Sequence, residues 1–145
     1  MKKGTPGFRW VSESRDGITF TEPVPMVYDD GNAFYSPSSI SKWLRHSGNG
    51  RLYWLGNILG DIPEGNLPRH PLCIGEFDEG RKCLQKDTVR IVDERKEGEG
   101  WRLQCSNFSF YEDRETHEMK IEYSRLGQSP EHRWMGDAVR FTVTI

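Results

Sequence analysis

The chain has 145 residues, a length that fits one domain of ordinary size. Its 20 Lys and Arg and 22 Asp and Glu leave a formal charge of −2, with both signs interspersed, so a nucleic-acid partner is not expected. No apolar run reaches the roughly 18 residues of a membrane-spanning helix, and residues 1–4 lack the apolar stretch of a signal peptide. We therefore expect no membrane partner either. The compartment stays open, because a longer parent protein could be secreted or periplasmic.

The composition favours β-structure over a helical bundle. Hydrophobic residues make up only 34% of the chain, whereas aromatic residues reach 12%. In addition, 15 Gly and 8 Pro interrupt the chain at short intervals. A thin core of large aromatic side chains, divided into short segments, is the expected result.

The cysteines carry no metal signature. Cys73, Cys83 and Cys105 form neither a CxxC pair nor an even set. We therefore expect buried free thiols, no metal site and no cofactor.

Short segments rich in aromatic and β-branched residues follow one another along the whole chain, each bounded by Gly, Pro, Asn or Asp. Strands are predicted over residues 8–14, 19–25, 38–44, 51–57, 72–77, 88–92, 103–111, 118–123 and 139–145. Residues 47–50, Ser-Gly-Asn-Gly, predict a tight turn because Asn and Gly accept positive φ angles. Only residues 40–45 compete as a helix, and that segment is too short to form one alone. The sequence thus predicts an all-β protein.

Three successive strands recur in the same order along the chain. Residues 38–40, 51–57 and 72–77 align with 106–108, 119–125 and 140–145, and residues 8–16 also align with 72–80. A repeat of about four strands without helices is typical of β-propeller blades. We therefore predict a single propeller segment, an incomplete ring of about two blades of four antiparallel strands plus a part. Its predicted pieces are the end of one blade (1–27), a complete blade (36–93) and most of a further blade (103–145).

The segment Ser14-Arg15-Asp16-Gly17-Ile18-Thr19-Phe20 resembles the Asp box of sialidase-type propellers, a turn between the two outer strands of a blade. Asp16 is expected to accept hydrogen bonds from backbone N–H groups, and Gly17 to supply the turn conformation. Residues 78–80 stand in the corresponding place of the next blade. Further stretches resemble bacterial sialidase-like, BNR-repeat glycosyl hydrolases, in the manner of the C-terminal part of a longer protein. These stretches are residues 34–40, 50–57, 68–72, 106–108 and 112–114.

The predicted topology sorts the loops between two faces. In a blade with strands A to D, the A–B and C–D connections emerge on one face, and the B–C and D-to-A connections on the other. The Asp box is a C–D connection, and in sialidase-like propellers it lies opposite the substrate. The resemblance therefore implies a substrate face built by residues 27–35, 58–70, 93–101 and 127–137. Residues 112–115 and His46 fall on the other face, where we expect a solvated, salt-bridged turn.

The resemblance implies candidate residues for cleaving a glycosidic bond. Tyr35 matches the tyrosine nucleophile of sialidases, and Asp30 is the candidate acid. Pro37, two residues after Tyr35, departs from the sialidase pattern, and a role in lining the axial channel is the favoured alternative for Tyr35. An Asp-Asp-Gly turn explains Asp29 and Asp30 equally well. The candidate substrate-binding residues are Asp29, Asn57, Arg69, His70, Arg133 and Trp134, of which the arginines suit a sugar carboxylate. The same loops also hold Asp61, Glu64, Asn66, Glu131 and His132.

Two kinds of function follow from these patterns. The first is a sialidase-like glycoside hydrolase segment that hydrolyses or binds a terminal sugar at the axial face. The alternative is a non-catalytic carbohydrate-binding or protein-interaction segment. A carbohydrate is thus the expected partner. Missing blades would leave open blade faces, so we also expect a homo-oligomer that closes the propeller. The apolar residues assigned to these faces are Trp10, Phe20, Phe108, Phe110 and Phe141.

Overall fold

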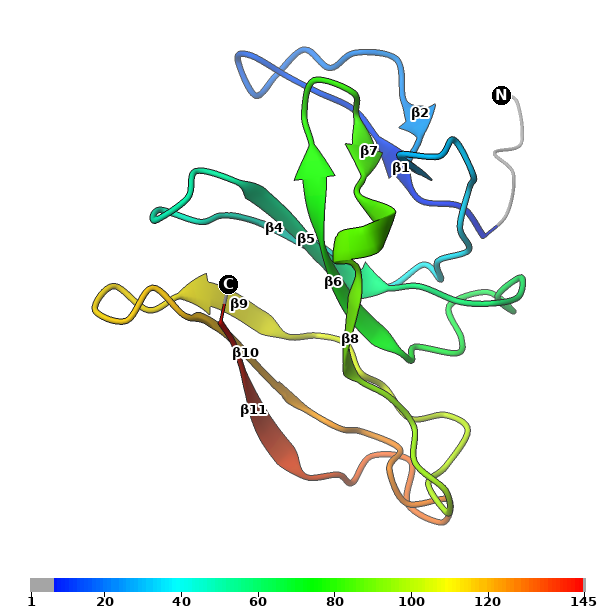
Figure 1. The fold of residues 1–145 in the computed structure, drawn as a ribbon. Helices are drawn as coiled ribbons and strands as arrows, with labels where there is room; N and C mark the ends of the chain where they lie inside the picture. Colours follow the sequence, from blue (N-terminus) through cyan, green and yellow to red (C-terminus); the bar gives the residue numbers. More distant parts are fainter. Residues whose placement is uncertain (1–6, 145) are drawn as a thin grey trace.

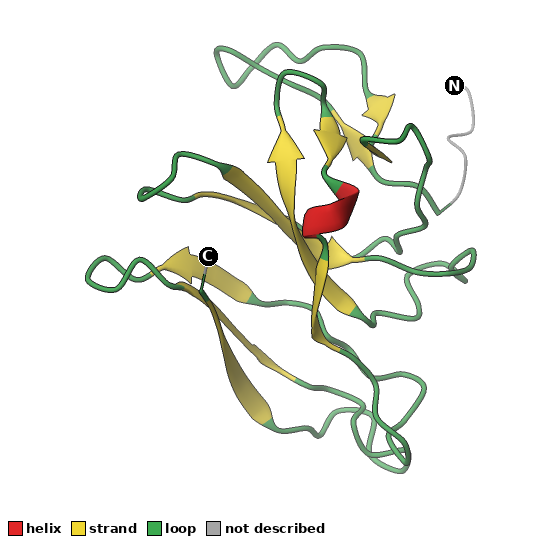
Figure 2. Cartoon of the chain, viewed as in Figure 1, coloured by secondary structure: helices red, strands yellow, loops and turns green. Residues whose placement is uncertain are grey.

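The computed structural model describes residues 7–144, and in this range the protein is built of strands (Figure 1). Three sheets, mostly antiparallel, hold these strands, and a single 3-10 turn, η1 (Lys86–Thr88), is the one helical element of the described residues (Figure 2). The predicted all-β class is confirmed. Two predictions, on residues 1–4 and on Ile145 as the end of the last strand, lie outside the described residues.

The first sheet is a hairpin of β1 (Trp10–Val11) and β2 (Val24–Pro25). Its turn carries the Asp-box residues. The Asp16 carboxylate accepts the backbone N–H groups of Ile18 at 2.9 Å and Thr19 at 2.8 Å, and these bonds hold the pKa of Asp16 well below its ordinary value. The local hydrogen bonding expected for this turn is therefore confirmed.

The central sheet contains four strands that follow one another in antiparallel order. They are β4 (Lys42–Arg45), β5 (Leu52–Asn57), β6 (Leu72–Asp78) and β7 (Cys83–Leu84). The one segment that competed as a helix, residues 40–45, therefore contains strand β4 and no helix.

Two further strands join the outer part of the central sheet. β3 (Val27–Tyr28) pairs in parallel with β7, and β8 (Arg90–Asp93) pairs with the opposite end of β6. The sequence predicted β8 but neither β3 nor β7. Each of those two has only two residues, and only their contact with each other and with β6 makes them strands.

The third sheet repeats the order of β4, β5 and β6. It consists of β9 (Ser109–Glu112), β10 (Met119–Ser124) and β11 (Ala138–Val143), all antiparallel. Trp43 pairs with Trp54 in the central sheet, and Phe110 pairs with Ile121 in the third. The sequence alignment matched Trp54 with Glu122, so it is wrong by one residue. Since side chains alternate along a strand, that slip exchanges the two faces of the sheet.

Two hydrophobic clusters cover the two faces of the central sheet. Between the central and third sheets lie Tyr53, Leu55, Leu72, Ile74, Leu103, Cys105, Phe108, Met119, Ile121 and Tyr123. On the opposite face, Trp54, Phe77 and Leu84 pack against Met26 and Phe34 from the N-terminal part. Each such buried side chain contributes about 1.5–3 kcal/mol. The chain therefore forms three layers in sequence order, with the central sheet in the middle.

The expectation of a raw apolar face at the C-terminal end is wrong. Phe108 is 3% exposed, and Phe110 and Phe141 are partly buried against the cluster between the two sheets. The outer face of the third sheet is polar instead: Arg140 pairs with Glu122 at 2.6 Å, and Glu122 also accepts the Tyr111 hydroxyl at 3.0 Å. These side chains are covered because the third sheet turns them toward the central sheet, against which it packs.

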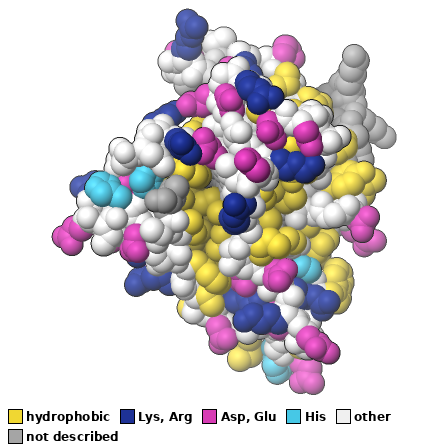
Figure 3. All heavy atoms as spheres, viewed as in Figure 1, with side chains coloured by type: hydrophobic (Ala, Val, Ile, Leu, Met, Phe, Trp, Pro, Cys, Tyr) yellow, Lys and Arg dark blue, Asp and Glu magenta, His cyan; other side chains and the backbone are white. Residues whose placement is uncertain are grey.

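The N-terminal hairpin does expose apolar side chains, as expected, with Trp10 at 42% and Phe20 at 61%. Elsewhere, acidic and basic side chains are interspersed over the face seen in Figure 3. Residues 7–144 contain no helix that is long and apolar enough to cross a membrane. Nor do His, Cys, Asp or Glu side chains of this range gather in threes at a spacing suited to a metal ion.

The three cysteines are buried free thiols, which confirms their expected state. Burial raises the pKa of Cys73 to about 11 and that of Cys105 to about 12. A thiol with so high a pKa is protonated near neutral pH and is a poor nucleophile.

Candidate functional site

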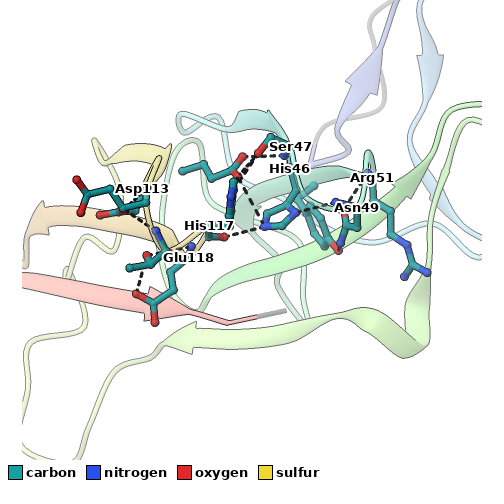
Figure 4. A network of polar contacts seen from close by, with 11 residues as sticks. His46, Ser47, Asn49, Arg51, Asp113, His117 and Glu118 are labelled. Carbon is teal, nitrogen blue, oxygen red and sulfur yellow. Dashed lines mark hydrogen bonds and ion pairs between the residues drawn. The ribbon is translucent and has the colours of Figure 1, made fainter.

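The short turns of the central and third sheets meet at one end of the molecule. There the Glu112 carboxylate accepts the Ser47 N–H at 2.8 Å and contacts His117 Nδ1 at 2.8 Å (Figure 4). The Ser47 hydroxyl and N–H together lower the pKa of Glu112 to about 2. His46 Nδ1 accepts the Asn49 N–H, so its Nε2 carries the proton that is donated to the His117 carbonyl at 2.7 Å. This network joins the two turns.

The network does not have the arrangement of a catalytic triad. The Ser47 hydroxyl and His117 Nδ1 both lie on the same oxygen of Glu112, and the hydroxyl lies 3.0 Å from that same ring nitrogen. A triad instead uses the two ring nitrogens of the histidine for the nucleophile and the carboxylate. Residues 112–115 and His46 thus form a salt-bridged turn network, as the sequence predicted, and this end of the molecule carries no candidate site.

At the other end, three longer loops lie against one another. They are residues 58–71, 94–108 and 125–137, which leave the ends of β5, β8 and β10 (Figure 1). Arg69 Nη1 donates to the Gln104 side chain at 3.1 Å, and the Arg69 carbonyl accepts the Cys105 N–H at 2.9 Å. The Gln104 N–H in turn donates to the Leu126 carbonyl at 2.8 Å. The middle loop is therefore bonded to both of its neighbours.

Two glycines let the middle and last loops touch. A Cβ atom on Gly100 would lie 2.5 Å from the Gly127 carbonyl oxygen, and one on Gly127 would lie 2.6 Å from the Arg102 carbonyl oxygen. Gly127 also has a φ of +76°, which side chains disfavour. The Gly100 N–H donates to the Gln128 carbonyl at 2.9 Å. Any larger residue at either glycine would separate the loops.

A cavity of about 200 Å³ lies where these loops meet. Its lining residues are Gly100, Trp101, Arg102, Gly127, Ser129, Pro130, Glu131 and Arg133. Pockets for drug-sized ligands measure about 300–1,000 Å³, so this one suits a smaller molecule such as a single sugar ring.

Each side of the cavity carries an arginine stacked on an indole. The Arg102 guanidinium lies 4.9 Å from the Trp101 ring centroid, and that of Arg133 lies 4.8 Å from the Trp134 ring centroid. Both tryptophans are exposed, Trp101 at 55% and Trp134 at 68%. An exposed indole packs against the apolar face of a ring, and a guanidinium binds a carboxylate with two parallel hydrogen bonds. Glu131 contributes a single carboxylate to the lining.

Several predicted residues stand at this end of the molecule. Arg133 lines the cavity and Trp134 adjoins it. His70 lies beside the Trp101 carbonyl, with its Nε2 at 3.4 Å, and burial lowers the pKa of His70. Arg69 donates to the Gln104 side chain and to the Asn66 carbonyl, which joins two loops, and it does not line the cavity.

Tyr35 and Asp30, the candidate nucleophile and acid, do not line this cavity. Tyr35 is partly buried, and its ring stacks on Phe8 with 5.3 Å between the centroids. Asp30 is exposed and pairs with Lys86 Nζ at 2.6 Å, and this contact lowers the pKa of Asp30 to about 2. An acid that protonates a leaving group needs a raised pKa, so Asp30 does not fit that role.

The Asp-Asp-Gly turn accounts for both aspartates. Asp30 accepts the Asn32 N–H at 2.9 Å, and Asp29 accepts the backbone N–H of Lys86 at 3.1 Å. The Asp29 carbonyl also accepts the Arg81 guanidinium at 2.8 Å. The bonds from Lys86 and Arg81 fasten the turn to the segments on either side of β7. Asp29 is therefore occupied by protein contacts and does not line the cavity either.

Asn57, a predicted substrate-binding residue, is occupied by contacts within the protein. Its side chain is fully buried and donates to the carbonyls of Pro71 at 3.0 Å and Cys105 at 3.1 Å. Its side-chain oxygen accepts the Ser39 hydroxyl at 2.7 Å. Asn57 ties three segments together from the inside and presents no atom to a ligand.

Six of the eight lining residues were not singled out by the sequence, and Trp101 and Arg102 are the two among them with large side chains. Trp101 stood at the edge of a predicted loop, and Arg102 lay just beyond it. The neighbouring sequence does not indicate that these two residues line a cavity. Their position depends on the contact between Gly100 and Gly127, which lie in separate loops. A tryptophan between glycine and arginine in an otherwise charged loop is the one signal available.

No protein-family model, curated protein or solved structure matches the chain. The resemblance to sialidase-like hydrolases therefore stays a prediction made from the residues themselves.

Proposed function

We propose that the chain is a segment of a sialidase-like, BNR-repeat β-propeller that binds a terminal acidic sugar in the cavity between residues 100–102 and 127–133. The layer arrangement supports the propeller. The central sheet has four antiparallel strands in sequence order, the third sheet has three, and the N-terminal hairpin has two. Successive layers in sequence order, each packed on the one before, are what adjacent blades require.

One observation carries the binding function. Arg102 and Arg133 approach the same cavity from two loops, each stacked on an exposed tryptophan. Two guanidinium groups against one carboxylate, that of Glu131, leave the lining with an excess of positive charge. A sugar with a carboxylate would meet the guanidinium groups with its charge and an indole with its ring. A neutral sugar would use only the second contact.

Binding is favoured over hydrolysis by this chain alone. Cleavage of a glycosidic bond requires an acid and a second group that captures or stabilises the oxocarbenium centre. Of the predicted pair, neither Tyr35 nor Asp30 lines the cavity, and Glu131 is the single carboxylate that does. We do not extend the proposal to a ring closed by copies of this chain, because the outer face of the third sheet is polar.

A titration of the full chain with sialyllactose tests this function. Binding is measured by tryptophan fluorescence and by calorimetry. We expect saturable binding with a change in indole emission, and much weaker binding of lactose. Arg133→Ala should weaken binding of sialyllactose by about tenfold or more, because a charge-assisted contact is lost. Arg114→Ala is the matched control, since Arg114 is an exposed arginine in the turn network at the opposite end. Equal affinity for the two sugars, or equal effects of the two variants, would overturn the proposal.

A further inference from the structure

A buried cluster of charges lies next to the cavity, at the start of the loop that carries Trp101. The side chain of Arg125 is 5% exposed and that of Asp93 is 6% exposed. Arg125 Nε donates to Asp93 Oδ2 at 2.8 Å. Its two terminal nitrogens donate to the two carboxylate oxygens of Glu99 at 2.5 and 2.9 Å, and one of them also donates to the Glu94 carbonyl at 3.0 Å. One guanidinium thus holds both ends of the loop from 93 to 99.

The inner half of this cluster belongs to the core. Asp93 Oδ2 accepts the Tyr123 hydroxyl at 2.5 Å and the Cys105 thiol at 3.6 Å, in addition to Arg125. These partners satisfy the carboxylate inside the packing between the central and third sheets. Removing Arg125 would leave Asp93 as an uncompensated buried charge, which is strongly destabilising. Arg125 and Asp93 therefore stabilise the fold as a pair.

Glu99 is the outer half of the cluster, and it belongs to the loop. Its Oε2 also accepts the Lys96 N–H at 2.8 Å, and its carbonyl accepts the Arg95 guanidinium at 2.9 Å. The next residue is Gly100, whose close approach to Gly127 forms one side of the cavity. A turn closed by the Leu103 N–H on the Gly100 carbonyl, at 3.0 Å, then presents Trp101 and Arg102.

We propose that Glu99 is a positioning residue for the cavity: its ion pair with Arg125 orders the turn that carries Trp101 and Arg102 before a sugar binds. This inference rests on the proposed function. Glu99 does not line the cavity, and its hydrogen bonds go to Arg125, Lys96 and Arg95. It acts through the backbone of Gly100. A site ordered in advance binds more tightly because its side chains need not be immobilised at binding.

The loop contains a matched control for this role. Glu97→Gln and Glu99→Gln each remove one negative charge from the same loop. Glu97 is exposed, whereas Glu99 contacts Arg125 through both oxygens. Neither change removes the Asp93–Arg125 pair from the core, so both variants should fold.

Two measurements on the full chain test the proposal, namely affinity for sialyllactose and amide hydrogen exchange. Glu99→Gln should weaken sialyllactose binding by about tenfold, because two side chains then have to be ordered during binding. It should also speed amide exchange over residues 95–102, with exchange in β10 unchanged. Glu97→Gln should match the wild type in both measurements.

The outcomes separate the two proposals. Wild-type binding of sialyllactose together with an unaltered affinity in Glu99→Gln would overturn the positioning role and leave the proposed function standing. Unaltered amide exchange over residues 95–102 in Glu99→Gln would also overturn the positioning role. If the wild-type chain binds neither sialyllactose nor free glucuronic acid, the proposed function fails, and the positioning role fails with it.

Discussion

Trp54 and Ile121 stand at equivalent positions in two successive sheets, and each is buried against the layer that precedes its own sheet in the chain. Trp54 belongs to the cluster with Met26 and Phe34, whereas Ile121 packs between the third and central sheets. Each also pairs with an aromatic residue of the neighbouring strand, Trp43 or Phe110. The repeat in the sequence is thus a repeat of packing direction, as well as of strand order.

This equivalence predicts which residue of β10 supports the core. Ile121→Ala should lower the free energy of unfolding by about 2–5 kcal/mol, because its side chain is fully buried between two sheets. Glu122→Gln should have a much smaller effect, since Glu122 faces outward beside Arg140. Urea titration of both variants measures the difference. If Glu122→Gln lost more unfolding free energy than Ile121→Ala, the alignment made from the sequence would be favoured over the observed register of β10.

The contact between two loops predicts an effect of the smallest possible substitution. Gly100→Ala adds a single methyl group 2.5 Å from the Gly127 carbonyl oxygen, so the two loops must separate. We expect a loss of about 1–3 kcal/mol in stability, together with loss of sialyllactose binding. Gly60→Ala is the control, because a Cβ at Gly60 meets no atom within 4 Å. Thermal melts and the sugar titration should show wild-type behaviour for Gly60→Ala; wild-type binding by Gly100→Ala would argue against the cavity.

Strand order was predictable from the sequence, whereas register and pairing partners were not. Aromatic and β-branched residues between Gly, Pro and Asn mark strands such as β5 and β10 locally. β3 and β7 were not predicted because each has only two residues, and these become strand residues through pairing with each other and, for β7, with β6. The one-residue error in the repeat arose because similarity of residue type does not record which face a side chain occupies.

The sequence placed Arg133 and Trp134 in loops at the end of the molecule where the cavity lies, because which connections share a face of a sheet follows from strand order alone. Most of the other residues that line the cavity were not predicted. Asn57 and Asp30 are occupied by protein contacts that the sequence did not predict, because the type of a polar residue does not reveal its partners. The carbonyls that occupy Asn57 and the lysine that pairs with Asp30 come from distant parts of the chain.

Asn57 predicts a stability effect where the sequence predicted a binding effect. Asn57→Ala leaves the buried carbonyls of Pro71 and Cys105 without this donor, and unpaired buried groups cost about 1–3 kcal/mol each. The variant should unfold at lower urea, while its folded fraction binds sialyllactose with the wild-type affinity. Asn66→Ala, an exposed asparagine in the neighbouring loop, should leave stability unchanged. Weaker sialyllactose binding by the folded Asn57→Ala variant would support a substrate-binding role for Asn57.

The turn network predicts a specific dependence of stability on pH. Hydrogen bonds from Ser47 lower the pKa of Glu112 to about 2 in the folded chain, below the value of about 4.3 expected when it is unfolded. The unfolded chain therefore takes up this proton first as the pH falls. The stabilisation by Glu112 is thus complete above about pH 4.3 and is lost as the pH falls through about 2.

Glu112→Gln should consequently be less stable than the wild type at pH 7, and the difference should shrink between pH 4 and pH 2. His46 and His117 flank the carboxylate, and neither is altered in this variant. Subtracting the variant's urea midpoints from those of the wild type across the pH range removes the effect of every other acidic group. Glu115→Gln, an exposed residue of the same turn, should follow the wild-type curve. A difference between wild type and Glu112→Gln that stays constant from pH 7 to pH 2 would mean that the Ser47 contacts do not stabilise the charged form of Glu112.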